Sequence, residues 1–169
     1  MFQGRWPNIL TVDAKNRLAL PAPFRQAGSG DVGDYMIGSL EDPCIYVHTA
    51  AQHQAFLDRL AALGETRQSR RVRDFVLWRF EPVTADAQGR ITIPSEMIAQ
   101  VGIQREVRLI SQEARLEIWA NEVFARVSAE VQASGIADVL EAVFAEEEQE
   151  RRLQRRAASS AREGNSPTK

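Results

Sequence analysis

One short motif occurs twice in this chain, and the repeat limits how the chain can fold. Residues 11–21 (TVDAKNRLALP) and residues 84–94 (TADAQGRITIP) align without gaps. The Thr, the Asp, the Ala after it, the Arg and the Pro are identical, and two Leu of the first copy correspond to two Ile of the second. A polar turn kept between apolar flanks in both copies indicates one structural unit used twice.

The residues around each motif predict the same order of elements in both copies. The Asp of the turn can accept hydrogen bonds from backbone amides two residues on, and Asn16 and Gly89 suit a positive φ. Pro21 and Pro94 end the second strand of each hairpin and begin a short helix. The predicted strands are 9–12, 18–20, 34–38, 44–48, 106–110 and 115–119, and the predicted helices are 22–27, 95–101 and the segments capped by Thr49 and Asn121.

Each unit has about 70 residues and short strands, too little to close a core alone. We therefore expect an α+β fold in which two pseudo-symmetric units pack together. The expected organisation is a first repeat (1–64), an Arg-rich helical connector with a strand (65–83), a second repeat (84–134), a charged C-terminal helix (135–156) and a disordered tail (157–169).

The composition, with 44% hydrophobic residues and a net charge of -2, is that of an ordinary globular protein. A single cysteine, Cys44, suits a reducing compartment. No apolar run approaches the roughly 20 residues that span a bilayer, and the N-terminal residues do not resemble a signal peptide. We expect a cytoplasmic protein that needs no membrane.

Positive charge gathers around both turns although the whole chain is slightly acidic. Between residues 5 and 25 four basic residues face one acidic residue, and between residues 67 and 90 six face three. Nearly all of these cations are Arg, whose planar fork suits phosphates and guanine edges. Nucleic acid is therefore a candidate partner, with solvated surface charge as the alternative.

The repeated motif resembles that of the MraZ family of bacterial transcriptional regulators. The resemblance rests on Met1-Phe2-x-Gly4, on Asp13-x-x-x-Arg17 followed by Leu-x-Leu-Pro21, and on Asp86-x-Gln88-Gly89-Arg90-Ile-x-Ile-Pro94 followed by Leu116-Glu-Ile-Trp119. It covers roughly residues 1–145 in order. The chain has Asn16 where that family usually has Gly, and Gln88 where its own first copy has Lys15.

The resemblance implies an AbrB-like fold, in which paired halves form a double-split β-barrel with flanking helices. It implies a homo-oligomeric ring that binds repeated boxes of double-stranded DNA in the promoter of its own division and cell-wall gene cluster, typically as a repressor, and hence a nucleoid-associated protein. The Asp-x-x-x-Arg turn is the DNA-contacting element of that family. No cofactor is expected.

Within the turns we assign Lys15 to phosphate, and Arg17 and Arg90 to phosphate or guanine edges. Arg5 and Arg25 are weaker candidates that would extend the same patch. Turn architecture is assigned to Asp13, Asn16, Asp86 and Gly89, with each Asp holding its Arg by charge-assisted hydrogen bonds. The alternative is that each Asp–Arg pair is only an internal salt bridge.

Arginines 67, 70, 71 and 73 form a second basic run in the connector. Their spacing of three or four residues places several on one helical face. A solvated helix or a contact to a neighbouring subunit explains them as well as DNA does, and we prefer the structural interpretation.

An enzyme is disfavoured because the only histidines, His48 and His53, have no glycine elbow or oxyanion motif nearby, although a Cys44/His48 pair could share a strand face. The same three residues are one ligand short of a typical structural zinc site, so no metal is expected. Two alternatives stay open. One is an AbrB-like antitoxin or protein-interaction module that uses residues 157–169, and the other is a purely structural ring.

Overall fold

The computed structural model describes residues 4–6, 9–27, 34–112, 115–137, 139–141 and 145. The chain divides into two compact units, residues 1–125 and 126–169. Most of the predicted C-terminal helix and the whole predicted tail lie outside the described residues, as does the segment 1–3. None of the described helices has the length and apolar character that crossing a membrane requires.

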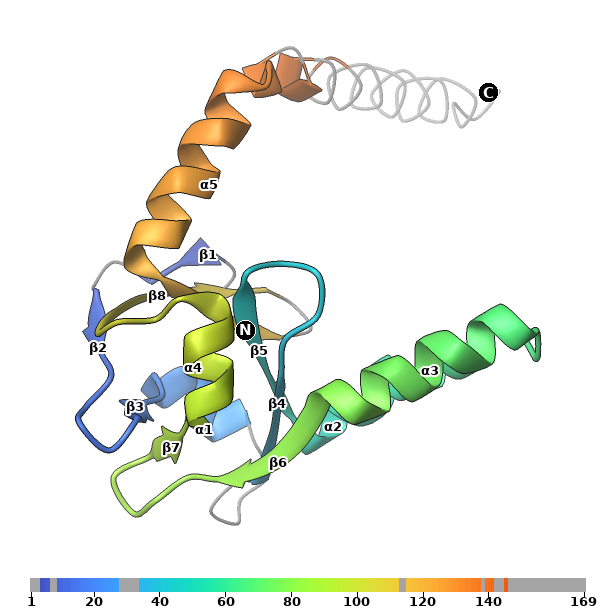
Figure 1. Ribbon diagram of the computed structural model, residues 1–169, viewed down its shortest axis with the longest axis horizontal. Coiled ribbons are helices and arrows are strands. Elements are labelled where there is room, and N and C mark those ends of the chain that lie inside the picture. The colour runs from blue at the N-terminus through green and yellow to red at the C-terminus, as the bar shows by residue number, and fades with distance from the viewer. Residues whose placement is uncertain are drawn as a thin grey trace, which may run out of the picture. The chain divides into compact units, whose positions relative to one another are not determined.

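The elements of the first unit follow the predicted order (Figure 1). Its strands are β1 (Gly4–Arg5), β2 (Leu10–Thr11), β3 (Arg17–Ala19), β4 (Asp34–Gly38), β5 (Cys44–Thr49), β6 (Phe80–Thr84), β7 (Arg90–Thr92), β8 (Glu106–Ser111) and β9 (Leu116–Ala120). Its helices are α1 (Ala22–Ala27), α2 (Ala50–Ala61), α3 (Arg67–Arg79), α4 (Ser95–Val101) and the beginning of α5 (Asn121–Ala133). The bounds of α1 and α4 are those predicted, and Gly102 ends α4 with a φ of 73°.

The large antiparallel sheet shows that the two repeats exchange strands. Its order is β1-β8-β9-β5-β4-β6, with β2 also pairing with β8. The strand before the first turn, β2, therefore lies on a strand of the second repeat, and the strand before the second turn, β6, which begins in the connector, lies on β4 of the first. The centre of the sheet is the β5–β9 pair, where one strand of each repeat meets. The repeats are interlocked, which explains why neither could close a core alone.

A second, two-stranded sheet joins the repeats again. Strand β3 pairs with β7 in antiparallel register, with Leu18 opposite Ile91. Leu18 and Ile91 are buried, as are Leu20 and Ile93, which follow them in the two motifs. Within the described residues the strands form these two sheets and no closed barrel. An α+β fold agrees with the prediction, and the double-split barrel remains a prediction.

One apolar core draws on both repeats. Besides the β3–β7 side chains it contains Phe24, Tyr35, Ile37, Ile45, Val47, Val101, Val107, Leu109, Leu116 and Ile118. Fully burying a side chain of this size contributes about 1.5–3 kcal/mol. Because these residues come from both sides of the connector, the core stabilises the exchanged arrangement itself.

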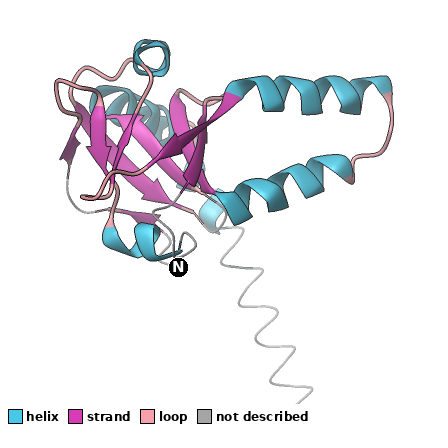
Figure 2. Ribbon diagram, turned by 90° about the horizontal axis from the view of Figure 1, so that it is seen from below, coloured by secondary structure: helices cyan, strands magenta, loops and turns pink. Residues whose placement is uncertain are grey.

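Helices α2 and α3 form a hairpin that extends from the sheet, as Figure 2 shows. Thr49 caps α2 as predicted, through a reciprocal pair of bonds with Gln52, and Thr66 caps α3 by accepting from the amide of Ser69. The predicted cap at Asn121 takes a different form, because α5 begins at that residue and its side chain bonds to Arg108 and Glu106 instead.

Candidate nucleic-acid interface

The first turn, residues 13–17, is organised by the carboxylate of Asp13. Asp13 Oδ1 accepts the backbone amides of Lys15 at 2.8 Å and Arg17 at 2.9 Å. Asp13 Oδ2 accepts Nε and Nη2 of Arg17 at 2.8 and 2.7 Å. Asn16 has a φ of 59°, the positive value predicted for it. One carboxylate thus fixes both the path of the backbone and the direction of the guanidinium.

The second turn, residues 86–90, repeats this geometry. Asp86 Oδ1 accepts the amides of Gln88 and Arg90, both at 3.0 Å. Asp86 Oδ2 accepts Nε and Nη2 of Arg90, both at 2.7 Å, and Gly89 has a φ of 74°. The local architecture that the repeated sequence predicts is therefore present in both copies.

Both turn carboxylates are stabilised in the charged form. The hydrogen bonds from the Arg17 side chain, followed by that from its backbone amide, lower the pKa of Asp13 from 3.8 to about 2. The corresponding bonds from Arg90 lower the pKa of Asp86. At neutral pH each turn thus holds an ionised Asp against an Arg.

The ion pairs leave charge available to a partner. About a third of each Arg side chain is exposed, with values of 30% for Arg17 and 31% for Arg90. A guanidinium has five N–H donors, and the carboxylate uses only those on one edge of the fork. The internal salt bridge and a DNA-contacting role are therefore compatible, since each Arg keeps N–H donors that its Asp does not use, although Nη2 of Arg90 also donates to Oε1 of Gln88 at 3.0 Å.

The β3–β7 ribbon puts the two arginines on one surface. Leu18 and Ile91 fill its inner face, so Arg17 and Ala19 of one strand and Arg90 and Thr92 of the other lie on the outer face. In the register, Arg17 is opposite Thr92 and Arg90 is opposite Ala19. The arginines are two residues apart along the ribbon, about 7 Å. A two-stranded ribbon of this kind is narrow enough to enter the major groove.

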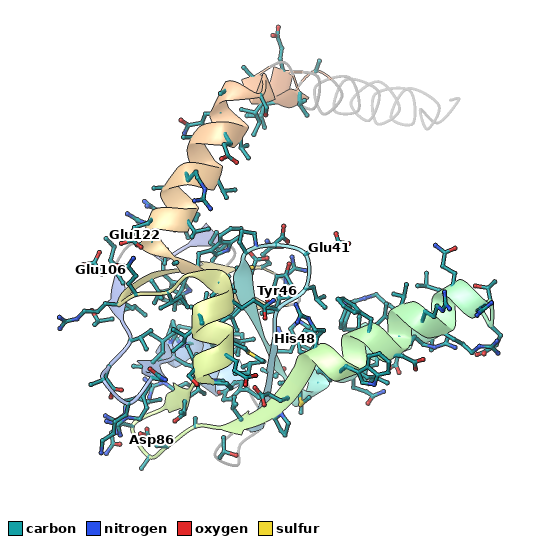
Figure 3. The ribbon with its side chains drawn as sticks, in the orientation of Figure 1. Glu41, Tyr46, His48, Asp86, Glu106 and Glu122 are labelled. Atoms are coloured by element: carbon teal, nitrogen blue, oxygen red, sulfur yellow. The ribbon has the colours of Figure 1, made fainter. Side chains whose placement is uncertain are left out.

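The two turns lie at opposite ends of the ribbon, and each is bonded to the end of the ribbon strand that the other repeat supplies. The amide of Leu20 donates to the carbonyl of Gly89 at 2.9 Å, and the amide of Ile93 donates to the carbonyl of Asn16 at 2.8 Å. Figure 3 labels Asp86 in the second turn, with nitrogen-bearing side chains gathered beside it. Each turn is thus held in place by the repeat to which it does not belong.

Lys15 is exposed at the tip of the first turn, and Arg25 lies on the second. Arg25 Nη1 donates to the carbonyl of Gln88 at 3.2 Å. In the sequence Arg25 follows the first turn. Only the fold shows that its side chain reaches from α1 to the second turn. Arg5 is in β1 at the edge of the large sheet, opposite Ile110, and is not part of the ribbon.

The connector arginines lie on α3, away from the ribbon. Arg73 pairs with Glu65 at 3.3 Å and donates to the carbonyl of Gly64, while Arg79 Nε donates to the carbonyl of Ser39. Arg70 and Arg71 are exposed. The contacts of Arg73 and Arg79 fit the structural interpretation.

Cys44 lacks the properties of a catalytic thiol. It is buried, and burial raises the pKa of the thiol to about 12, so no thiolate is available at neutral pH. His48 (labelled in Figure 3) contacts a second histidine instead: Nδ1 of His48 lies 3.3 Å from Nδ1 of His53. Burial, followed by the neighbouring His53, lowers the pKa of His48 to about 4.

The two histidines belong to an aromatic cluster that joins β5, α2 and β6. His48 stacks on Phe80 at 5.1 Å and meets Phe56 edge to face at 5.5 Å. Across the described residues, no three His, Cys, Asp or Glu side chains come together as metal ligands would. The arrangement is that of a packed cluster.

Comparison with known proteins agrees with the resemblance seen in the motif. The sequence profile of a family described as "MraZ protein, putative antitoxin-like" matches residues 81–155. A protein named transcriptional regulator MraZ from Legionella pneumophila (strain Corby) is 31% identical over 127 residues, which is 73% of this chain and 82% of that protein. A protein of the same name from Burkholderia vietnamiensis is 29% identical over 142 residues, 83% of this chain and 96% of that protein.

Proposed function

The chain belongs to the MraZ family, and from this premise we propose that it is a transcriptional regulator that binds double-stranded DNA through the β3–β7 ribbon. The observation that carries the proposal is that Arg17 and Arg90, each held by its own Asp, lie on one outer face of a rigid two-stranded ribbon. Lys15 at one end and Arg25 at the other add two further cations.

The fixed guanidinium forks explain how such a surface recognises DNA. An Arg whose Nε and Nη2 are held by a carboxylate does not lose further side-chain freedom when it binds, so less of the binding energy is lost to ordering. The N–H donors that the Asp leaves unused match phosphate oxygens or the O6 and N7 atoms of guanine. Phosphate contacts would position the ribbon, and any contact to a base edge would give sequence preference.

One ribbon alone neutralises few phosphates, which is too few for tight binding at cellular salt. We propose that the protein acts as a homo-oligomeric ring, in which several ribbons bind several repeated boxes and each bound ribbon raises the effective concentration of the next. An exposed apolar surface supports self-association, because Val72, Phe75 and Trp78 follow one another along α3 and Trp78 is 81% exposed.

The proposed target is the promoter of the gene cluster that encodes this protein, with repression of its own transcription in the cytoplasm, at the nucleoid. Spacing between subunits in the ring would then set the spacing of the boxes. The double-split barrel of AbrB-like proteins is the proposed description of the interlocked repeats, which is supported by the exchange of β2 and β6 between them.

Binding to duplex DNA from upstream of this protein's own gene tests the proposal. We expect Arg17→Ala to weaken binding about tenfold or more. The slope of log Kd against log salt should fall by about 0.9, the value for one lost phosphate contact. Arg71→Ala is the matched control, since it removes an exposed Arg from α3 and leaves the ribbon intact. An equal loss of DNA affinity in the two variants would show that the ribbon is not the specific interface. No loss of affinity in either variant would reject DNA binding by these arginines.

A further inference from the structure

The second turn lacks the cation that the first turn carries at its tip. Lys15 stands in the first turn, and Gln88 stands at the corresponding position of the second. The side chain of Gln88 is turned inward to its own Arg, since its Oε1 accepts Nη2 of Arg90 at 3.0 Å. By local sequence alone the second turn would therefore be close to neutral, with Asp86 balancing Arg90.

Arg25 supplies a charge at this place from the other repeat. It lies in the last turn of α1, 63 residues before Gln88, and its Nη1 donates to the Gln88 carbonyl. The side chain is exposed, and no carboxylate of the described residues forms a salt bridge with it. A single bond to a carbonyl leaves its charge and most of its donors free for a phosphate.

Gly89 has a positive φ and also leaves space for the Arg25 side chain. A Cβ at Gly89 would collide with the Cδ, Nε and Nη1 atoms of Arg25, so the guanidinium occupies the space where a side chain would begin. In the first turn the corresponding residues are Asn16, which has a Cβ, and Ile98, which is uncharged and packs against the core. The two repeats thus differ in a concerted way at three positions.

We infer that Arg25 is the phosphate-binding cation of the second turn, the counterpart of Lys15, and that the absence of a Cβ at Gly89 leaves the space in which it lies. Each subunit then presents two charged tips of similar strength at the two ends of the β3–β7 ribbon, and the second tip is built from both repeats. This inference rests on the proposed function, since it names a further contact of the same DNA surface.

A salt series on duplex DNA from upstream of this protein's own gene tests the inference. Arg25→Ala should reduce the slope of log Kd against log salt by about 0.9, the loss of one phosphate contact, as should the matched variant Lys15→Ala. Arg25→Lys should keep the slope. In the Arg25→Ala background, Gln88→Lys should restore it, because a lysine at the tip replaces the missing charge from its own repeat.

The structural alternative is that Arg25 only clamps the second turn. In that case Arg25→Ala would leave the salt slope unchanged and Gln88→Lys would rescue nothing, while Arg17→Ala still lowered the slope; this would overturn the inference and leave the proposed function standing. If Arg17→Ala and Lys15→Ala also left the slope unchanged, the proposal that the β3–β7 ribbon binds DNA would be rejected. Thermal unfolding of each variant verifies that the fold is intact.

Discussion

The first and second turns have the same backbone and the same Asp–Arg pair, but their charge reaches the surface by different routes. In the first turn the added cation is local, at Lys15. In the second it arrives from α1 of the other repeat, as Arg25 on the Gln88 carbonyl. The comparison teaches that the two copies of a duplicated motif can keep the same geometry while the added positive charge comes from different parts of the chain.

Removing both turn arginines should have the largest effect. We expect Arg17→Ala and Arg90→Ala each to cost about 1–3 kcal/mol of DNA binding, and the double variant to weaken binding about a thousandfold. Fluorescence anisotropy with the upstream duplex measures all three. A double variant no weaker than Arg17→Ala alone would show that only the first turn meets DNA.

Acid should destabilise the protein through the first repeat, where β5 carries His48 next to its last residue, while the corresponding residue of the second repeat is Trp119. The folded pKa of His48, about 4, is below the ordinary 6.5, so the unfolded chain binds the proton more strongly. Its contribution is fully present above pH 6.5 and is lost as pH falls towards 4, to a total of about 3 kcal/mol.

Urea unfolding across this pH range measures the effect. His48→Phe keeps an aromatic ring beside Phe56 and Phe80 and should make the dependence shallower, while His53, whose pKa burial also lowers, remains. An equally steep dependence in His48→Phe would assign the acid sensitivity to other groups.

Substitution of the positive-φ residue by Ala should lower the stability of the protein more in the second turn than in the first. Gly89→Ala should cost about 1–2 kcal/mol, because Ala disfavours a φ of 74° and its Cβ meets Arg25. Asn16→Ala should cost less, about 1 kcal/mol or below, since a Cβ is already accommodated at Asn16. Thermal unfolding should show a fall in Tm of about 2–8 °C for Gly89→Ala; equal shifts for both variants would remove the steric distinction.

Exchanging the tip residues should have the smallest effect. Lys15→Gln gives the first turn the residue of the second, and we expect the salt slope of DNA binding to fall by about 0.9 with little change in stability. In the wild-type background Gln88→Lys adds a charge where Arg25 already lies, so the slope should rise by less than this. A larger gain from Gln88→Lys than loss from Lys15→Gln would contradict the view that the second tip is already charged.

The turns were predictable because the bonds that make them are short in sequence. Asp13 accepts from residues two and four positions later, so the identity of a few neighbours decides the geometry. Helix α4 was predictable for the same reason, between Pro94 and Gly102. Asn121 shows where local reasoning fails: its side chain suits a helix cap, but Arg108 and Glu106 of the adjacent strand β8 bind it instead.

The sequence by itself determined that a charged turn is used twice, which residues anchor it, and where the nearby helices begin and end. Only the tertiary structure decided that the repeats exchange strands, that Arg17 and Arg90 share one face of a ribbon, and that Arg25 lies on the second turn. The physical reason is the range of the interactions. Hydrogen bonds within five residues depend on local sequence, whereas strand exchange and the Arg25 contact depend on how one shared core packs across the whole first unit.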